Sequence, residues 1–279
     1  MNKIQRIQIF EETTQLANQG FYLNEDNQKI YINNIDENMI NGTIFYGKKI
    51  NINLDELPIY DTEIHVTNMD TLYQAQQLIQ NNPLDNVAVL NMASFHTPGG
   101  GVTKGANAQE ENIFRRTNIF KSLFQFHHVG DQYNVKQKEE RYPLDYNFGT
   151  IYTPYVTVFR KSDDHDYQLM KQPFIVNVIS TPSIKNPKTE NNKLVTWAKN
   201  TIKNKIKQIL NTALINNNKI LVLSAFGCGA YNNPPKEIAK LFADILASEQ
   251  YQGKFKQIYF AIIDNDNSNN FQIFKEIFE

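Results

Sequence analysis

Three consecutive glycines precede a pair of carboxylates at a spacing that could support acid/base chemistry. Residues 98–111 read PGGGVTKGANAQEE, so seven residues separate Gly101 from Gln109, and Glu110 and Glu111 follow directly. A glycine backbone carries no side chain and adopts positive φ without strain, which permits the close approach of a ligand. A carboxyl group beside such a loop could protonate a leaving group and then activate water.

The same residues also have a simpler structural interpretation. Asn107 followed three residues later by Glu110 resembles a capping box, and acidic residues stabilise a helix N-terminus. A glycine triplet is frequent in tight turns. The glycine triplet and the acidic pair are less common together than either is alone. Here they follow Val87–Met92 (VAVLNM), an apolar run that is typical of a buried strand. We therefore expect Asn107 to be the N-cap of a helix whose first turn carries both carboxylates.

A second glycine-rich segment, SAFGCGAYNNPP, begins at Ser224 and follows another apolar run. Such a loop can turn successive backbone N–H groups inward and bind a diphosphate. An ordinary strand-to-helix turn is the alternative. Cys228 lies between two glycines of this segment, but no histidine lies near it in sequence to act as a base. We therefore expect Cys228 to be a small buried residue and not a nucleophile.

The histidines do not show the spacing of a metal site. His127 and His128 are adjacent, and we expect their side chains to point apart on a helix. His96 precedes the first glycine loop and could contact a substrate, although a surface position in a loop is the simpler interpretation. We expect neither a metal site nor a cofactor.

Strands and helices alternate along most of the chain, which indicates an α/β domain with a largely parallel sheet. In such sheets ligands bind beyond the carboxyl ends of strands, where both glycine-rich loops lie. The expected strands cover residues 62–67, 87–92, 156–159, 174–180, 220–225 and 257–263, and the expected helices lie near residues 3–19, 70–80, 108–126, 194–210, 234–246 and 270–278. Residues 1–61 are expected to form an N-terminal extension packed on a main body of residues 62–279.

The composition restricts the function further. The 279 residues include 28 basic and 29 acidic side chains, for a net charge of −1, which argues against binding duplex nucleic acid through a basic surface. A single cysteine excludes an internal disulfide and favours a reducing compartment. The chain contains no run of 18 apolar residues, and its first residues do not resemble a signal peptide. We expect a cytoplasmic protein that is a monomer and does not bind membranes.

The motif of three glycines, seven residues and Gln-Glu-Glu resembles the signature of poly(ADP-ribose) glycohydrolases. VAVLNMASFHTPGGGVTKGANAQEE is similar to the microbial branch of that family. The resemblance extends over nearly the whole chain, in family order, through RIQIFEETTQLANQGFY, EIHVTNMDTLYQAQQL, IYTPYVTVFR, VNVISTP and LSAFGCGAYNNPP. It implies a macrodomain-like three-layer α/β sandwich with a mixed, mostly parallel sheet flanked by helices.

The resemblance also implies an activity, which is hydrolysis of the ribose–ribose O-glycosidic bond to release ADP-ribose, from the ends of chains. Glu111 would be the general acid/base, Glu110 would hold ribose hydroxyls or orient the scissile bond, and Gln109 would support them by hydrogen bonding. Asn91 would contact the distal ribose, with a strand-terminal turn as its alternative role. The implied binding residues are Asn91, Gly99, Gly100, Gly101, Gln109, Ala225, Phe226, Gly227, Cys228, Gly229, Ala230 and Tyr231.

The sequence departs from the family at Tyr231, where relatives show a phenylalanine stacked on the ribose of the ligand. A tyrosine ring can still stack, and its hydroxyl adds a hydrogen bond. Two alternative functions stay open. One is a hydrolase that removes mono-ADP-ribose from a protein or a nucleobase, and the other is a non-catalytic ADP-ribose-binding module. A nicotinamide-dinucleotide dehydrogenase is excluded because no G-x-G-x-x-G follows a first strand.

Overall fold

The computed structural model describes residues 1–264 and 268–279, which form two compact units. The first unit contains residues 1–45, 93–144 and 151–180, and the second contains residues 46–92, 145–150 and 181–279. Each unit therefore combines segments that are distant in sequence. The expected boundary between residues 61 and 62 stays a prediction.

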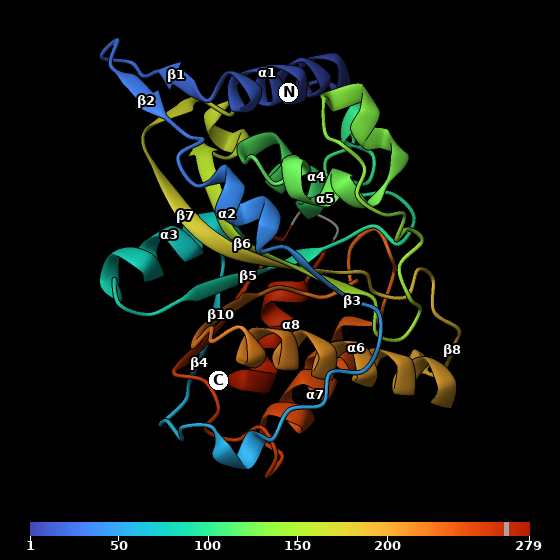
Figure 1. Cartoon of the computed structure of the whole chain (residues 1–279). Helices are drawn as coiled ribbons and strands as arrows, with labels where there is room; N and C mark the ends of the chain where they lie inside the picture. Colours follow the sequence, from blue (N-terminus) through green and yellow to red (C-terminus); the bar gives the residue numbers. More distant parts are fainter. Residues whose placement is uncertain (265–267) are drawn as a thin grey trace. The chain divides into compact units, whose positions relative to one another are not determined.

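The first unit begins with α1 (Lys3–Gln19), dark blue in Figure 1. Asn2 and Gln5 form a reciprocal capping box at its start, and Gly20, at φ 86°, ends it by donating its N–H to Leu16. Both ends match the sequence prediction. A short antiparallel pair, β1 (Phe21–Leu23) and β2 (Lys29–Tyr31), follows, and then α2 (Asp36–Asn41). The α2 helix was not predicted.

A single helix was predicted near residues 108–126, and the structure divides this segment. Helix α4 (Gln109–Arg116) ends at Thr117, which is extended, and α5 (Phe120–Leu123) follows. Thr117 pairs with Val158 across an isolated antiparallel bridge, and its hydroxyl donates to the carbonyl of Ile113. The prediction of one continuous helix was therefore wrong, because this long-range pairing draws the chain out of the helix.

Two long strands, β6 (Thr150–Arg160) and β7 (Leu169–Thr181), run antiparallel and supply most of the sheet in the first unit. Their pairing is interrupted by irregularities near Pro154 and Phe159. Tyr155 has a positive φ of 57° at the first of these, where its N–H donates to the side chain of Asn177. The short strand β3 comprises Ile44–Tyr46.

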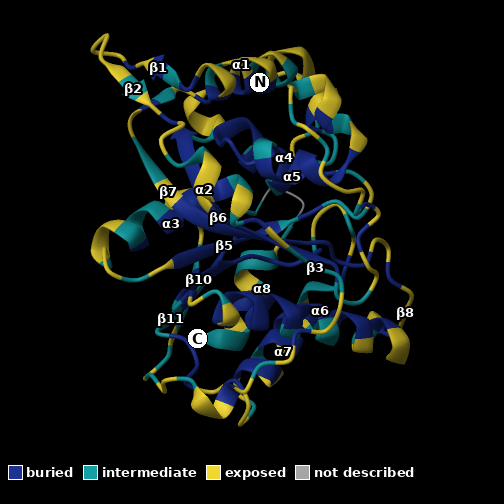
Figure 2. Cartoon of the chain, in the orientation of Figure 1, coloured by how far each residue is buried: buried dark blue, intermediate teal, exposed yellow. Residues whose placement is uncertain are grey.

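The second unit contains four parallel strands. These are β4 (Glu63–Thr67), β5 (Val87–Met92), β10 (Ile220–Leu223) and β11 (Gln257–Ala261). Strand β10 pairs in parallel with β5 on one side and β11 on the other, and β11 pairs in parallel with β4. The apolar strands β5 and β10 are almost wholly buried, as their dark blue colour in Figure 2 shows. This confirms the prediction that these runs are buried parallel strands.

The helices of the second unit are α3 (Thr71–Asn81), α6 (Thr196–Ile215), α7 (Pro235–Leu246) and α8 (Asn270–Phe278). Helix α3 packs on β5 and β10, and α8 packs on β4 and α7. Asp70 caps α3 by accepting the N–H of Tyr73, as predicted. The unit also contains a two-stranded hairpin, β8 (Thr189–Glu190) and β9 (Lys193–Leu194), which was not predicted.

The seven-stranded sheet has the order β3-β6-β7-β5-β10-β11-β4. The fold is therefore a mixed α/β fold with a seven-stranded, mostly parallel sheet flanked by helices, which confirms the predicted class. No helix within residues 1–264 and 268–279 has the length and apolar character needed to cross a membrane.

Helix α6 buries a lysine. Lys205 is 1% exposed, and its Nζ has no hydrogen-bond partner among the described residues. Burial lowers the pKa of Lys205 from 10.5 to about 8, against the opposing charge of Asp145. Between these two pH values the folded protein binds fewer protons than the unfolded chain, so stability should rise as the pH rises through this window.

Replacement of Lys205 by methionine should stabilise the protein at neutral pH. The lowered pKa corresponds to a cost of roughly 3 kcal/mol for burying the charged ammonium group, and Lys205→Met would remove this cost. The free energy of unfolding, measured in urea, should increase at pH 7, and the difference from wild type should shrink as the pH approaches 10.5. Lys207→Met, at a partly exposed position of the same helix, is the control. A Lys205→Met protein that is less stable than wild type at pH 7 would contradict this account.

Candidate active site

The first group of predicted residues lies in the first unit, where a glycine loop meets the start of α4. Gly99 and Gly100 have positive φ values of 78° and 54°. The loop is closed by hydrogen bonds from the N–H of Gly100 to the carbonyl of Thr97 and from the N–H of Val102 to that of Gly99, both 3.0 Å. Residues other than glycine rarely adopt this backbone conformation. The glycines are therefore required for the turn itself.

Both carboxylates of α4 are held by backbone N–H groups, and each of the four oxygens accepts at least one such bond. Glu110 accepts from Ser94 at 2.7 Å and from Gly99 at 3.0 Å. Glu111 accepts from Gly101 at 2.8 Å and from Ala108 at 2.9 Å. Hydrogen bonds to a charged group contribute about 1.5–3 kcal/mol each. The two side chains are 3% and 7% exposed, so this arrangement fixes two buried carboxyl groups beside the loop.

These bonds correct the predicted helix cap. Ala108, and not Asn107, is the N-cap residue of α4. Its N–H is bound by the carboxylate of Glu111, whereas the carboxylate of Glu110 turns away to Ser94 and Gly99. The capping pattern read from Asn107 and Glu110 was wrong, because the loop N–H groups compete for the first carboxylate. Gln109 occupies the first position of the helix.

The loop has no space for a side chain at Gly100. A Cβ atom there would lie 2.5 Å from Oε1 of Glu111 and 3.0 Å from Oε2 of Glu110. At Gly101 a Cβ atom would lie 2.8 Å from the Cβ of Ala106 and 3.6 Å from Oε1 of Glu111. Both carboxylates therefore lie against the bare backbone of the loop, in the space that a side chain at Gly100 would need.

Helix α1 braces α4 through a residue that the sequence analysis missed. Arg115 is fully buried, donates from Nε to the carbonyl of Arg6 at 3.1 Å, and also donates to the carbonyl of Ala106. Burial lowers the pKa of the Arg115 guanidinium, and the charge of Glu111 opposes that change. Arg115 follows Glu111 by four residues, and this i,i+4 pairing of opposite charges could have identified it.

A buried phenol also lies within the electrostatic field of Glu110. Tyr142 is 6% exposed. Burial, followed by the charge of Glu110, raises the pKa of Tyr142 well above its ordinary value. The phenol is therefore neutral wherever the protein is folded at ordinary pH. No local pattern in the sequence connects Tyr142 with a glutamate 32 positions earlier.

The second group of predicted residues lies in the second unit, at the carboxyl ends of two neighbouring strands. Asn91 is fully buried near the end of β5, and the loop of residues 224–234 follows β10. The parallel register pairs Val89 with Val222, so Asn91 and Ser224 each lie two residues beyond that pair. The structure thus brings Asn91 beside the start of the second glycine-rich loop. This loop contains the predicted residues Ala225, Phe226, Gly227, Cys228, Gly229, Ala230 and Tyr231.

Asn233, which the sequence analysis did not select, holds this loop in shape. It is 2% exposed, and its Nδ2 donates to the carbonyls of Ile184 at 2.8 Å, Gly227 at 3.0 Å and Tyr231 at 3.3 Å. Gly227 has a φ of 76°, and a Cβ atom there would lie 2.4 Å from the hydroxyl of Ser183. In the sequence, Asn233 stands directly before two prolines, and this pattern indicates only the start of a helix.

Cys228 has the properties of a structural residue. Burial raises the pKa of its thiol well above the ordinary value, and the thiol contacts the carbonyl oxygen of Phe226 at 3.8 Å. A thiol with a raised pKa is a poor nucleophile. This supports the interpretation of Cys228 as a small loop residue.

Two histidines contradict the expectation that their side chains point apart. The rings of His127 and His128 stack with centroids 4.0 Å apart, because His127 is extended and lies outside a helix. With Glu140 they form a group whose potential ligand atoms lie within 4.8 Å of one another. However, Nδ1 of His127 accepts the N–H of Val129 at 3.0 Å, which places the ring proton on Nε2. A metal-binding imidazole normally donates through its second nitrogen, so this arrangement does not suit a metal.

The fold and these two groups define a macrodomain-like α/β protein with a carboxylate pair on a glycine loop. Residues 10–161 match the family described as microbial-type PARG, catalytic domain, where PARG denotes poly(ADP-ribose) glycohydrolase. The chain belongs to this family, as the sequence resemblance predicted. The comparison with curated proteins gave no match.

Solved structures of bacterial glycohydrolases are similar over nearly the whole chain. Poly(ADP-ribose) glycohydrolase from Thermomonospora curvata, bound to the inhibitor ADP-HPD, is 27% identical, with a TM-score of 0.78 over 97% of this chain and 98% of that one. The enzyme from Deinococcus radiodurans in complex with ADP-ribose is 25% identical, with a TM-score of 0.70 over 89% of this chain and 98% of that one.

Substitution of Gly100 by alanine should destabilise the loop. The new methyl group would clash with Glu111 at a backbone conformation that alanine avoids, which should lower the free energy of unfolding by about 1–3 kcal/mol. Gly229→Ala is the matched control, since a Cβ atom at Gly229 meets nothing within 4 Å. Chemical denaturation of both variants tests this, and equal stability of the two would contradict the described packing.

Proposed function

We propose that this chain hydrolyses the ribose–ribose O-glycosidic bond of poly(ADP-ribose) and releases ADP-ribose, with Glu111 as the general acid/base. One observation carries the proposal. The carboxylate of Glu111 is fixed by the N–H groups of Gly101 and Ala108 against a side-chain-free loop, in a chain of the microbial-type PARG family. The bare glycine backbone beside the carboxyl group would let a substrate come close to it.

The proposed reaction needs one carboxyl group in two protonation states. Protonated Glu111 gives its proton to the ribose oxygen that leaves as the glycosidic bond breaks, and positive charge develops on the anomeric carbon. Glu111, now a carboxylate, then takes a proton from the water that attacks this carbon. The water supplies the hydroxyl of the released ADP-ribose, and Glu111 returns to its protonated form.

Glu110 and the glycines would position the substrate. We propose that Glu110 holds ribose hydroxyls or orients the scissile bond, supported by Gln109. The bonds from Ser94 and Gly99 hold the Glu110 carboxyl group in place, which suits an acceptor of hydroxyl hydrogen bonds. Gly100 and Gly101 would line the distal ribose with backbone alone, because neither residue carries a side chain.

The second glycine-rich loop would bind the diphosphate. Ala225–Tyr231 follows a buried parallel strand, and the amide of Asn233 binds three carbonyls of this region, which fixes the shape of the loop. Backbone N–H groups of such a loop can bind a diphosphate. Asn91, beside this loop, would contact the distal ribose. Tyr231 is partly exposed and would stack on the ligand in place of the phenylalanine of relatives.

Cleavage from chain ends is part of the proposal and is supported by the resemblance to compact microbial enzymes. The lengths of the products over time distinguish it from internal cleavage, since terminal cleavage releases single ADP-ribose units from the start. Parallel assays on mono-ADP-ribosylated protein and ADP-ribosylated DNA test the mono-ADP-ribosyl alternative. Tight binding of ADP-ribose without turnover would favour a non-catalytic module.

Replacement of Glu111 by glutamine should abolish most of the activity. The amide keeps the size of the side chain but cannot donate or accept the catalytic proton, so release of ADP-ribose should fall by roughly 10²–10⁴-fold, the usual range for a general acid/base. Release is measured by chromatography on defined polymer. Glu249→Gln, at an exposed position, is the matched control and should retain wild-type activity. A Glu111→Gln enzyme within a few fold of wild type would refute the assignment.

Replacement of Asn233 by aspartate should weaken ADP-ribose binding. The three carbonyls would lose their shared donor and face a negative charge, so the loop should shift and the affinity should fall by about tenfold or more. Calorimetric titration with ADP-ribose measures this. The control is Asn211→Asp, which also breaks a buried hydrogen bond, to the carbonyl of Ile50. This variant should be less stable but should bind ADP-ribose as tightly as the wild type. Unchanged affinity in Asn233→Asp would argue against a diphosphate on this loop.

A further inference from the structure

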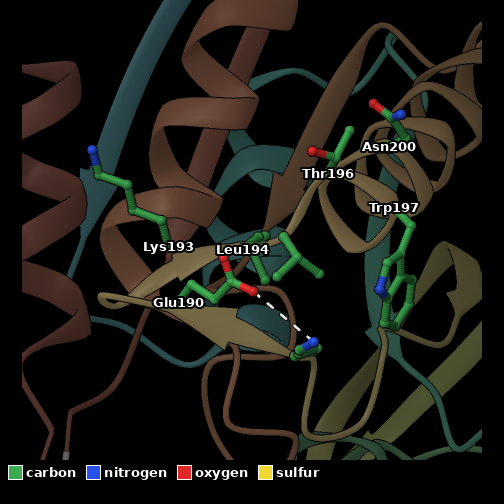
Figure 3. A pocket seen from close by; sticks show the side chains of 8 residues that line it. Glu190, Lys193, Leu194, Thr196, Trp197 and Asn200 are labelled. Carbon is green, nitrogen blue, oxygen red and sulfur yellow. Dashed lines mark ion pairs between the residues drawn. The ribbon is translucent and has the colours of Figure 1, made fainter.

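A pocket of the second unit lies between the β8–β9 hairpin and the first turn of α6. It encloses about 660 Å³, and Figure 3 shows its side chains rising from both elements. Trp197 forms one wall, and Leu194 forms part of the floor. None of the residues predicted for catalysis or binding lines it. The pocket is therefore a separate feature of the molecule.

Trp197 makes this pocket unusual. It is the only tryptophan of the chain, and half of its surface is exposed. An exposed aromatic face offers a surface on which a nucleobase can stack. An indole face in a pocket is thus suited to stack on a nucleobase.

Cationic and hydrogen-bonding groups line the same pocket as the indole. Lys188 and Lys193 come from the hairpin, and only Glu190 opposes their charge, at 3.9 Å from the Lys188 ammonium. Thr196 and Asn200 add a hydroxyl and an amide from the same face of α6, four residues apart. Aromatic stacking together with positive charge is the combination that recognises a nucleotide phosphate and its base.

The chain connects this pocket directly to the second glycine-rich loop. The N–H of Asn186 donates to the carbonyl of Tyr231 at 2.8 Å, and Nδ2 of Asn232 donates to the side chain of Asn186 at 2.8 Å. Lys188, at the rim of the pocket, follows two residues later, which is at most roughly 7 Å of backbone. A polymer with one diphosphate on the loop could place a neighbouring unit at the pocket.

We propose that the Trp197 pocket is an accessory site for a nucleoside diphosphate, occupied by an ADP-ribose unit of the polymer next to the one bound on the loop of residues 225–231. The adenine stacks on Trp197, and Lys188 and Lys193 bind the diphosphate. The assignment to poly(ADP-ribose) rests on the proposed function. This site would give long polymers a second point of attachment to the protein. The protein would therefore bind polymer in preference to a single ADP-ribose unit.

The fluorescence of Trp197 tests this site without any turnover. Titration of the wild type with ADP should quench the fluorescence, because the only indole is the proposed stacking surface. The double variant Lys188→Ala/Lys193→Ala keeps the indole and should bind ADP about tenfold more weakly. Lys199→Ala removes a charge from the same helix outside the pocket and should quench as the wild type does. No quenching by millimolar ADP, or equal affinity in the double variant, would overturn the proposal.

A second measurement identifies the occupant. The KM for poly(ADP-ribose) of about twenty units should rise several-fold in Trp197→Ala, while kcat stays unchanged. Oligoadenylate of equal charge should compete for the pocket less well than the polymer, and tighter binding of oligoadenylate would overturn the assignment in favour of single-stranded nucleic acid. If the protein hydrolyses polymer normally but ADP does not quench the Trp197 fluorescence, only the accessory site is refuted. If ADP quenches the fluorescence but the protein does not hydrolyse polymer, only the proposed function is refuted.

Discussion

Four backbone N–H groups that each bind one carboxylate oxygen are the interaction on which the first unit depends. Glu110 and Glu111 are almost fully buried, and isolated charges there would be costly without these donors. The donors come from the residues around the glycine turn and from the start of α4, so the loop and the helix determine one another's position. A side chain at Gly100 would occupy the place of the carboxylates. The same hydrogen bonds therefore stabilise the local fold and position the two carboxyl groups.

The N-terminal helix contributes to this arrangement from a distance in sequence. Arg115, in α4, donates to the carbonyl of Arg6 in α1, and the hydroxyl of Thr13 donates to the carbonyl of Arg115 at 2.6 Å. The side chain of Arg6 in turn donates to the carbonyl of Gly105 at 2.8 Å, beyond the glycine loop. Helix α1 thus supports both ends of the segment that carries the carboxylates. The second loop has an equivalent support in Asn233, whose single amide joins three carbonyls.

Elements with strong local signals were predictable from the sequence. The apolar run Val87–Met92 and the capped start of α3 at Asp70 are examples, since burial and capping act within a few residues. The break at Thr117 was not predictable, because it depends on a backbone bridge to Val158, far along the chain. The β8–β9 hairpin is too short for a periodic pattern, although its two turn asparagines, 191 and 192, adopt the positive φ values typical of a tight hairpin. The composition and spacing of the two glycine-rich segments could be read in advance, whereas their supports could not, because these come from distant residues.

The position of the Glu111 carboxyl relative to a bound ligand tests the central claim most directly. A crystal structure of the chain with ADP-ribose would show it. The account predicts an oxygen of Glu111 within about 2.6–3.2 Å of the hydroxyl on the anomeric carbon, with the carboxyl still held by Gly101 and Ala108. ADP-ribose bound elsewhere on the chain, or an anomeric hydroxyl beyond hydrogen-bonding reach of Glu111, would contradict it.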